Sequence, residues 1–305
     1  MGQPIPTLIF GSGAFALPVL TCLLDSTLVD VRAVITAPPR PAGRKGELRP
    51  SPVAVATQSR GIPTWTPTSL RERAVLEQLG AEAAELIVLA DYGRIIPAAV
   101  LEMPGYGALN LHPSLLPRHR GASPVPAAIL EADDKTGVTL MRMDEGLDTG
   151  PILAQLEVAL DGSEVAPMLE ERLALLGADL LMDRLPSWLD GSLQARTQPG
   201  EGATLPRPLR RSDGRLDPRK AAVELERQVR AYQPWPGSWI ETGDRRLIVW
   251  RASVVAAAAG EAGEIVPHGD SVALLTSADA LRLDELQPAG KRRMSGAEYR
   301  RGRRQ

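Results

Sequence analysis

The sequence predicts an α/β protein with two domains. The first is an open, mostly parallel Rossmann-like sheet with helices on both faces, and the second is a small antiparallel β-barrel. Short apolar runs alternate with helical segments over the first part of the chain, as in a parallel sheet with helical crossovers. Short strand-like runs separated by Gly and charged turns follow near the C-terminus, as in small barrels. We place the first domain at 1–198, a Gly/Pro-rich linker at 199–208 and the second domain at 209–305.

The chain begins with strand 7–10, a turn containing Gly11 and Gly13, a helix, and strand 29–36. This order is the start of a parallel α/β sheet. The two glycines suggest a dinucleotide-binding turn, but the third glycine is missing, and no acid ends the second strand to bind a ribose. We therefore interpret the glycines as a tight turn into a helix.

Residues 37–50 are rich in proline and carry four cations and a single acid. Because the segment is too Pro-rich for a helix and too polar for a strand, we expect an exposed loop. Its cations either keep the surface soluble or contact phosphates, and the length of the loop and its near absence of acids favour contact with phosphates. Ser51 and Pro52 then start a helix that ends near residue 61. The four cations are Arg40, Arg44, Lys45 and Arg49.

The alternation continues to residue 189. Strand 85–90 is almost entirely apolar, as expected for a strand buried on both faces. The turn 91–97 follows it, and Asn110 and His112 lie at the end of the next strand, so both belong to the edge where parallel sheets bind ligands. The other predicted strands are 63–65, 107–112, 136–143 and 151–160, and the other helices are 69–79, a short one to 103, 124–131 and 163–189.

Asn110, His112 and Asp148 are polar side chains beside long apolar runs. A histidine near a carboxylate can move a proton at neutral pH, and an asparagine amide can donate to a developing oxyanion. Alternatively, the histidine is a buried structural residue and the other two form turns, which Asp-Thr-Gly favours. No GxSxG motif is present and Cys22 falls in an early helix, so the attacking group is expected to come from a substrate. This pattern fits direct acyl transfer to an amine.

The segments NLHPSLLPRHRGASP (110–124) and MDEGLDTG (143–150) resemble the signature of the 10-formyltetrahydrofolate-dependent formyltransferases. The resemblance implies that Asn110, His112 and Asp148 are catalytic and that 10-formyltetrahydrofolate is the co-substrate. It also implies that folate contacts come from two segments, through Ser114, Leu115, Leu116 and Pro117 and through Tyr92, Ile95 and Ile96.

Three further segments, 40–53, 231–239 and 286–296, resemble the branch of this family that formylates methionyl-initiator-tRNA. The resemblance covers most of the chain and implies an OB-like second domain that binds tRNA. It departs from the family pattern at Pro113, Pro126 and Pro218. The residues expected to contact tRNA are Arg40, Arg44, Lys45, Arg49, Lys291, Arg292 and Arg293.

The charge distribution agrees with a polyanionic partner. Residues 1–200 hold 16 Lys and Arg against 23 Asp and Glu, whereas residues 201–305 hold 19 against 14. A basic segment on an acidic protein indicates a polyanion, although a solvated, disordered tail has the same composition. Trp235, Trp239 and Trp250 either stack on bases or, as we favour, pack in the core.

The composition also excludes several classes. One cysteine and three histidines argue against an intrachain disulfide and a Cys/His metal site, so we expect no metal. With no apolar run of membrane-spanning length and no signal peptide, we expect a cytoplasmic monomer that does not bind membranes. Two other hypotheses stay open: a formyltransferase acting on a small amine such as an amino sugar, and an RNA-binding protein with a decayed enzyme domain.

Overall fold

The computed structural model describes residues 3–42, 46–243 and 245–302, and its contacts divide the chain into two compact units. The first unit comprises the chain up to Pro124 together with 135–159 and 170–206. The second comprises 125–134, 160–169 and the chain from Arg207 onward. Because the second unit includes two short segments from within the first 198 residues, the simple domain limits stated above stay a prediction.

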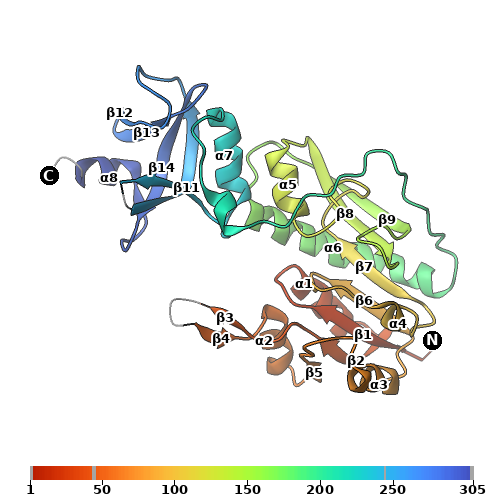
Figure 1. The fold of residues 1–305 in the computed structure, drawn as a ribbon. Helices are drawn as coiled ribbons and strands as arrows, with labels where there is room; N and C mark the ends of the chain where they lie inside the picture. The colour runs from red at the N-terminus through yellow and green to blue at the C-terminus, as the bar shows by residue number, and fades with distance from the viewer. Residues whose placement is uncertain (1–2, 43–45, 244, 303–305) are drawn as a thin grey trace. The chain divides into compact units, whose positions relative to one another are not determined.

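The first unit is built on a seven-stranded sheet with the order β5-β2-β1-β6-β7-β8-β9 (Figure 1). The first five strands in this order are parallel, whereas β8 runs antiparallel to β7 and β9 antiparallel to β8. The predicted open, mostly parallel sheet is thereby confirmed. The strands are β1 Ile5–Gly11, β2 Val29–Ile35, β5 Thr64–Trp65, β6 Leu86–Ala90, β7 Ala108–His112, β8 Lys135–Arg142 and β9 Ile152–Ala159.

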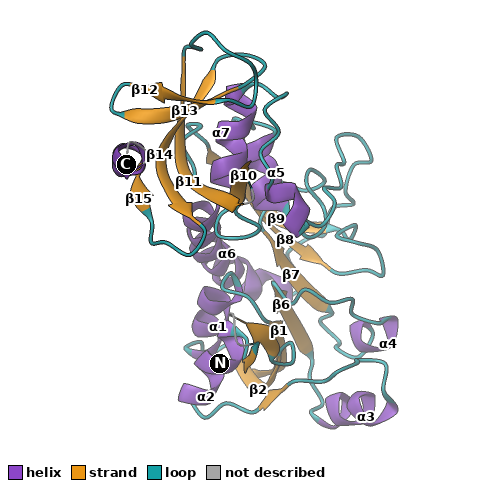
Figure 2. Ribbon diagram, turned by 60° about the vertical axis from the view of Figure 1, so that its left-hand side comes forward, coloured by secondary structure: helices purple, strands orange, loops and turns teal. Residues whose placement is uncertain are grey.

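Helices cover both faces of this sheet (Figure 2). On one face, Leu79 of α3 and Val100 of α4 pack with Phe10 of β1 in a buried cluster. On the other face, α6 approaches closely at Gly177, where an added Cβ would lie 3.3 Å from Val138 Cγ1. The helices of the first unit are α1 Ala16–Leu24, α2 Pro52–Ser59, α3 Arg73–Ala81, α4 Ala98–Leu101 and, from Glu170 onward, α6 Ala166–Leu189, whereas α5 Pro124–Leu130 falls almost wholly in the second unit.

The cationic segment after β2 differs from the irregular loop that the sequence predicts. It forms a hairpin of β3 (Arg40–Ala42) and β4 (Glu47–Arg49), with Arg40 opposite Arg49. An exposed two-stranded ribbon needs no apolar face, so its polar composition did not prevent strand pairing. Arg44 and Lys45 lie outside the described residues. The Ser51 cap of α2 is confirmed, since its hydroxyl accepts the Ala54 N–H at 3.0 Å, whereas α3 begins at Arg73 and not at Ser69.

The second unit contains an antiparallel sheet with the order β10-β11-β14-β13-β12 and β15 beside β14. Register shifts near Arg251 bend β11 and β14, and the curled sheet agrees with the small barrel expected. Leu225 and Val229 of α7 pack into the core of the unit. The elements are the 3-10 helix Arg211–Gly214, α7 Ala222–Ala231, β10 Ser238–Thr242, β11 Arg245–Val255, β12 Ile265–His268, β13 Ser271–Leu275, β14 Ala280–Pro288, β15 Met294–Ser295 and α8 Gly296–Gly302.

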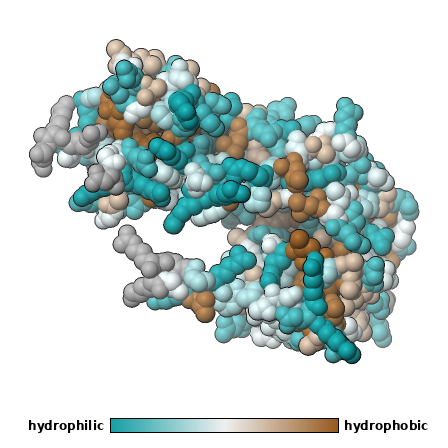
Figure 3. Space-filling model, viewed as in Figure 1, coloured by the Kyte–Doolittle hydropathy of each residue, from teal (hydrophilic) through white to brown (hydrophobic). Residues whose placement is uncertain are grey.

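The basic C-terminal segment is ordered in part. Ser295 and Glu298 start α8 with a reciprocal cap, because each side chain accepts the other residue's backbone N–H, at 3.2 and 2.8 Å. On the face shown in Figure 3 the surface is mostly hydrophilic, with hydrophobic side chains in separate patches. Within the described ranges, no helix has both the length and the apolar character needed to span a membrane.

Candidate active site

Asn110, His112 and Asp148 lie together in the first unit. Asn110 and His112 are on β7, and Asp148 is on the loop between β8 and β9. Asn110 Nδ2 donates to Asp148 Oδ1 at 3.4 Å, and Asp148 Oδ2 lies 3.7 Å from His112 Nδ1. Only 6% of the His112 side chain and 13% of the Asp148 side chain are exposed. This geometry allows an amide donor and an acid–base pair to act at one place, and the catalytic roles themselves stay a prediction.

The shape of the β8–β9 loop brings Asp148 to the strand. Asp144 Oδ1 accepts the Gly146 N–H at 3.0 Å and the Thr149 hydroxyl at 2.8 Å, which closes a tight turn. At Gly150, an added Cβ would lie 1.9 Å from the Arg142 carbonyl oxygen. Any other residue there would therefore displace the loop that carries Asp148.

The ring nitrogens of His112 have different partners. Nε2 lies 2.8 Å from the carbonyl oxygen of His119. Because a carbonyl oxygen only accepts, Nε2 carries the proton of that hydrogen bond. Nδ1 is left facing the Asp148 carboxylate. Proton exchange at His112 is therefore directed to the nitrogen on the Asp148 side.

Asp148 Oδ2 has a second partner in the backbone N–H of Gly121, which donates to it at 2.7 Å. Gly121 has a φ of +88°, which is easily reached only without a side chain. The side chains of Leu147 and Leu205 flank this glycine, and both are exposed. The carboxylate thus accepts hydrogen bonds from Asn110 and from the Gly121 backbone, and it lies beside an exposed apolar pair.

Sequence reasoning missed Gln198, which holds the Asp148 loop. Its side-chain amide donates to the carbonyl oxygens of Asp148 at 2.9 Å and Gly150 at 2.7 Å. Its own oxygen accepts two hydrogen bonds from Arg120, from Nε at 3.1 Å and Nη2 at 2.8 Å. Gln198 is buried, yet it precedes a Gly/Pro-rich stretch that predicts a linker, and no periodic pattern marks it as a supporting residue.

Asp91 is a further acidic group at the carboxyl edge of the sheet. Burial, followed by the charge of Glu170, raises its pKa to about 7, against the opposing effect of the Phe15 N–H. One side of Asp91 reaches solvent, but the surrounding protein still removes much of its hydration. The Asp91 carboxylate fills the space that a side chain at position 13 would need, because a Cβ added to Gly13 would lie 1.6 Å from Asp91 Oδ2.

The segment 91–97 was expected to contact folate through three residues. Ile95 is 79% exposed and presents an apolar surface to solvent. Tyr92 and Ile96 are buried, and Tyr92 packs edge-on against Phe10 with ring centroids 5.3 Å apart. Arg94 fixes the segment, because it donates to the carbonyl oxygens of residues 67 and 68. Ile95 is thus the exposed side chain of the three, and the folate assignment of all three stays a prediction.

Hydrogen bonds to neighbouring residues hold the segment 114–117 in place. Ser114 is fully buried, and its hydroxyl donates to the Arg118 carbonyl at 2.7 Å. Leu116 is buried, and its backbone binds Thr139 and Gln155. Leu115 and Pro117 are partly buried. These residues shape the loop, and their predicted folate contacts are open to test.

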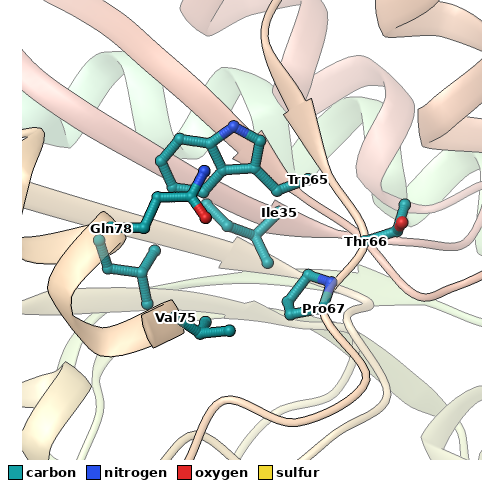
Figure 4. Close-up of a pocket in the computed structure, with 7 residues that line it drawn as sticks. Ile35, Trp65, Thr66, Pro67, Val75 and Gln78 are labelled. Carbon is teal, nitrogen blue, oxygen red and sulfur yellow. The ribbon is translucent and has the colours of Figure 1, made fainter. Parts of the chain in front are cut away.

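A pocket of about 260 Å³ lies at the edge of the sheet. Figure 4 shows its lining, with Trp65 from β5 and Gln78 from α3. Pro67 also lines it, and the Pro67 carbonyl accepts a hydrogen bond from Arg94. None of the residues predicted for the site lines this pocket. Its lining is mainly apolar.

The basic residues predicted to contact tRNA are exposed where the structure describes them. Two of them, Arg292 and Arg293, also have carboxylate partners. Arg40, Arg49 and Lys291 are exposed. Arg292 lies 2.9 Å from Glu298. Arg293 stacks on Trp250, with its guanidinium carbon 3.5 Å from the ring centroid, and lies 3.8 Å from Glu285.

The three tryptophans of the second unit have different environments. Trp239 is buried, as expected for a core residue. Trp250 is half-buried beneath Arg293 and donates to Gln287 at 3.1 Å. Trp235 is 55% exposed, so its ring has surface to offer a base.

The sequence matches two family models. Residues 5–185 match the model described as formyl transferase, and residues 208–304 match the formyl transferase C-terminal domain. A methionyl-tRNA formyltransferase of Myxococcus xanthus is 42% identical over 299 residues, which cover 97% of this chain and 95% of that protein. The corresponding protein of Novosphingobium aromaticivorans is 43% identical over 96% of this chain and 95% of its own length.

Solved structures share the fold. An N-formyltransferase of Helicobacter canadensis, in complex with folinic acid and dTDP-3-aminofucose, has a TM-score of 0.65 at 16% identity, covering 92% of this chain and 98% of that chain. A methionyl-tRNA formyltransferase from Clostridium thermocellum has a TM-score of 0.56 at 18% identity, covering 82% of this chain and 93% of that chain. At these identities the likeness shows the fold alone.

Proposed function

The chain belongs to the formyl transferase family, and we propose that it transfers a formyl group from 10-formyltetrahydrofolate to the α-amino group of methionyl-initiator-tRNA. Similarity to methionyl-tRNA formyltransferases over nearly the whole of both chains supports this substrate pair. The observation that carries the chemistry is the placement of the Asn110 amide and the His112 ring beside the Asp148 carboxylate. We further propose that 199–208 links a catalytic domain to a tRNA-binding domain.

The residues at the carboxyl edge of the sheet fit a folate. A pterin ring is flat and apolar on its faces and has donors and acceptors along its edge. Ile95 presents an exposed apolar side chain there, and the backbone around it is held in place by Arg94. We propose that segments 91–97 and 114–117 hold the folate, with Ile95 against a ring face. When bound, 10-formyltetrahydrofolate supplies the formyl carbon that the amine attacks.

Asn110 is the donor for the charge that develops on the formyl oxygen. Its amide has two N–H bonds, so Nδ2 can donate one to Asp148 and the other to a reacting oxygen. His112, two residues further along β7 and on the same face, supports this charge electrostatically when it carries a second proton, because its Nε2–H already donates to the His119 carbonyl. Removing one such donor costs about 10²–10³ in rate, which makes Asn110→Ala a severe variant.

Asp148 and His112 form the acid–base pair. Asp148 Oδ2 and His112 Nδ1 face each other at 3.7 Å, so a proton taken from the attacking amine can be held there. It is then passed to N10 of the folate as the bond between N10 and the formyl carbon breaks, which leaves tetrahydrofolate and the formylated amine. The chain supplies no nucleophile to this mechanism. Burial raises the pKa of the Cys22 thiol to about 11, which keeps it protonated and unreactive at neutral pH.

Exposed cations are proposed to hold the tRNA. Arg40 and Arg49 on the β3–β4 hairpin, with Lys291, Arg292 and Arg293 in the second unit, would contact phosphates and give salt-dependent affinity. Arg44 and Lys45 belong to the same proposal from the sequence alone. We expect the protein to act as a monomer in the cytoplasm, where initiator tRNA is used.

The proposal is tested by comparing acceptors. Purified protein with 10-formyltetrahydrofolate is given methionyl-tRNA, methionine, or a nucleotide-linked amino sugar, and the formylated product is quantified. We expect product only with methionyl-tRNA. Formylation of the amino sugar at a comparable rate would favour the small-amine hypothesis, and absence of product from every acceptor would refute the proposal.

A further inference from the structure

The segment after Gln198 belongs to the wall of the candidate active site. We propose that Thr204 is a positioning residue: it fixes the backbone of His119, whose carbonyl holds His112 in one tautomer and one orientation. The kinetic part of this inference rests on the proposed function, whereas the tautomer of His112 does not. Thr204 lies two residues before Pro206, the last residue of the first unit.

Thr204 contacts the loop 117–120 through both its backbone and its side chain. Its N–H donates to the Pro117 carbonyl at 3.3 Å, and its carbonyl accepts the Arg120 N–H at 2.9 Å. Its hydroxyl accepts the His119 N–H at 2.8 Å and lies 3.2 Å from His119 Nδ1. A single threonine therefore binds the peptide groups on both sides of the His119 Cα.

These contacts lead directly to the catalytic histidine. The Arg120 N–H and the His119 carbonyl are the two ends of one planar peptide unit. The N–H end is held by Thr204, and the carbonyl end accepts the His112 Nε2–H at 2.8 Å. Because the peptide unit is rigid, fixing its N–H end sets the direction in which its carbonyl points.

The backbone of His119 needs this support. Its φ is +56°, a left-handed conformation that costs a residue with a side chain about 1 kcal/mol or more. Such a conformation persists when surrounding contacts determine it. If the Thr204 hydroxyl is removed, the His119 N–H loses its acceptor, and the residue can relax to a negative φ. The His119 carbonyl would then turn away from His112 against the one bond that remains, from the Arg120 N–H to the Thr204 backbone carbonyl. Nε2 would lose the partner that selects its proton.

The experiment uses ¹⁵N-histidine NMR together with steady-state kinetics. The chain contains only three histidines, His112, His119 and His268, so the ring signals can be assigned by single substitution. Thr204→Val keeps the size of the side chain and removes the hydroxyl, and Thr204→Ser restores the hydroxyl. Thr197→Val is the matched control, because Thr197 is exposed and its hydroxyl makes no hydrogen bond to any described residue.

In the wild type we expect Nε2 of His112 to carry a proton at every pH between about 6 and 9, since the carbonyl partner is always present. In Thr204→Val we expect a mixture of the two neutral tautomers. We also expect kcat to fall roughly 10- to 100-fold, the usual cost of a misplaced catalytic group, with both KM values changed less than about threefold. Thr204→Ser and Thr197→Val should match the wild type.

A wild-type spectrum that already shows mixed tautomers of His112 would overturn the proposal without any variant, so it remains testable even if Thr204→Val fails to fold. A folded Thr204→Val with the wild-type spectrum and kcat would also overturn it. If the wild type transfers no formyl group to methionyl-tRNA, the proposed function fails, and the spectra alone decide the role of Thr204.

Discussion

Replacing Gln198 by leucine tests whether the segment after α6 holds the Asp148 carboxylate in place. Leucine has a similar volume but can neither donate to the Asp148 and Gly150 carbonyls nor accept from Arg120. The two amide-to-carbonyl bonds contribute about 1 kcal/mol each, and the two Arg120 bonds, which share one acceptor oxygen, contribute about 1.5 kcal/mol together. Burial of the apolar leucine offsets about 1 kcal/mol of this loss. The free energy of unfolding should therefore fall by about 2–3 kcal/mol.

The variant is measured by thermal unfolding and by formyl transfer. A loss of this size lowers Tm by about 5–10 °C in a domain of this length. Release of the Asp148 loop should lower kcat by about 10- to 100-fold, because small displacements of catalytic groups are costly. Gln194→Leu is the matched control, since Gln194 is exposed and makes only a 3.4 Å contact with Gly191. If Gln198→Leu is as stable and as active as this control, the supporting role of Gln198 is refuted.

Three other expectations follow from the geometry. Gly150→Ala places a Cβ 1.9 Å from a backbone carbonyl and should cost about 3 kcal/mol in chemical denaturation, whereas Gly80→Ala, a helical site with open space, should be neutral or stabilising. Because the folded state raises the pKa of Asp91 to about 7, the contribution of Asp91 to the free energy of unfolding should decline from about pH 4 to pH 7. Asp91→Asn should therefore melt higher than wild type at pH 8 and equally at pH 4, and a pH-independent difference would contradict this. Arg49→Ala should raise KM for tRNA, leave KM for folate unchanged and reduce by about 1 the slope of log tRNA affinity against log salt concentration. Arg184→Ala on α6 is the control and should change none of these, and an equal loss of folate binding by Arg49→Ala would contradict the prediction.

Local patterns sufficed for most of the first unit. The apolar run at 85–90 and the Ser51-Pro52 pair carry their structural information within a few residues, and both β6 and the start of α2 agree with prediction. Asn110 and His112 lie at the end of β7, which the sequence indicates by the proline that follows at position 113. The hairpin at Arg40–Arg49 was missed because strand pairing there satisfies backbone groups and buries no side-chain pattern.

The supporting residues of the site could not be predicted from local sequence. Gln198 and Thr204 act through backbone groups that are 48 to 87 positions away in the chain, and nothing in their own neighbourhood distinguishes them from linker residues. The positive φ of His119 is likewise imposed by distant partners. Asp148 was singled out as a polar residue beside apolar runs and then supported by a resemblance to a family signature, whereas its hydrogen bond to Gly121 depends on the folded loop.

The most direct test of the account is single-turnover formyl transfer from 10-formyltetrahydrofolate to methionyl-tRNA, comparing initiator with elongator tRNA and wild type with Asp148→Asn. The account predicts a strong preference for initiator tRNA. It also predicts that Asp148→Asn slows transfer by about 10²–10⁴ while tRNA and folate still bind. Transfer by Asp148→Asn within a few-fold of the wild-type rate would contradict the role given to the carboxylate, and wild-type protein that formylates neither tRNA would contradict the function itself.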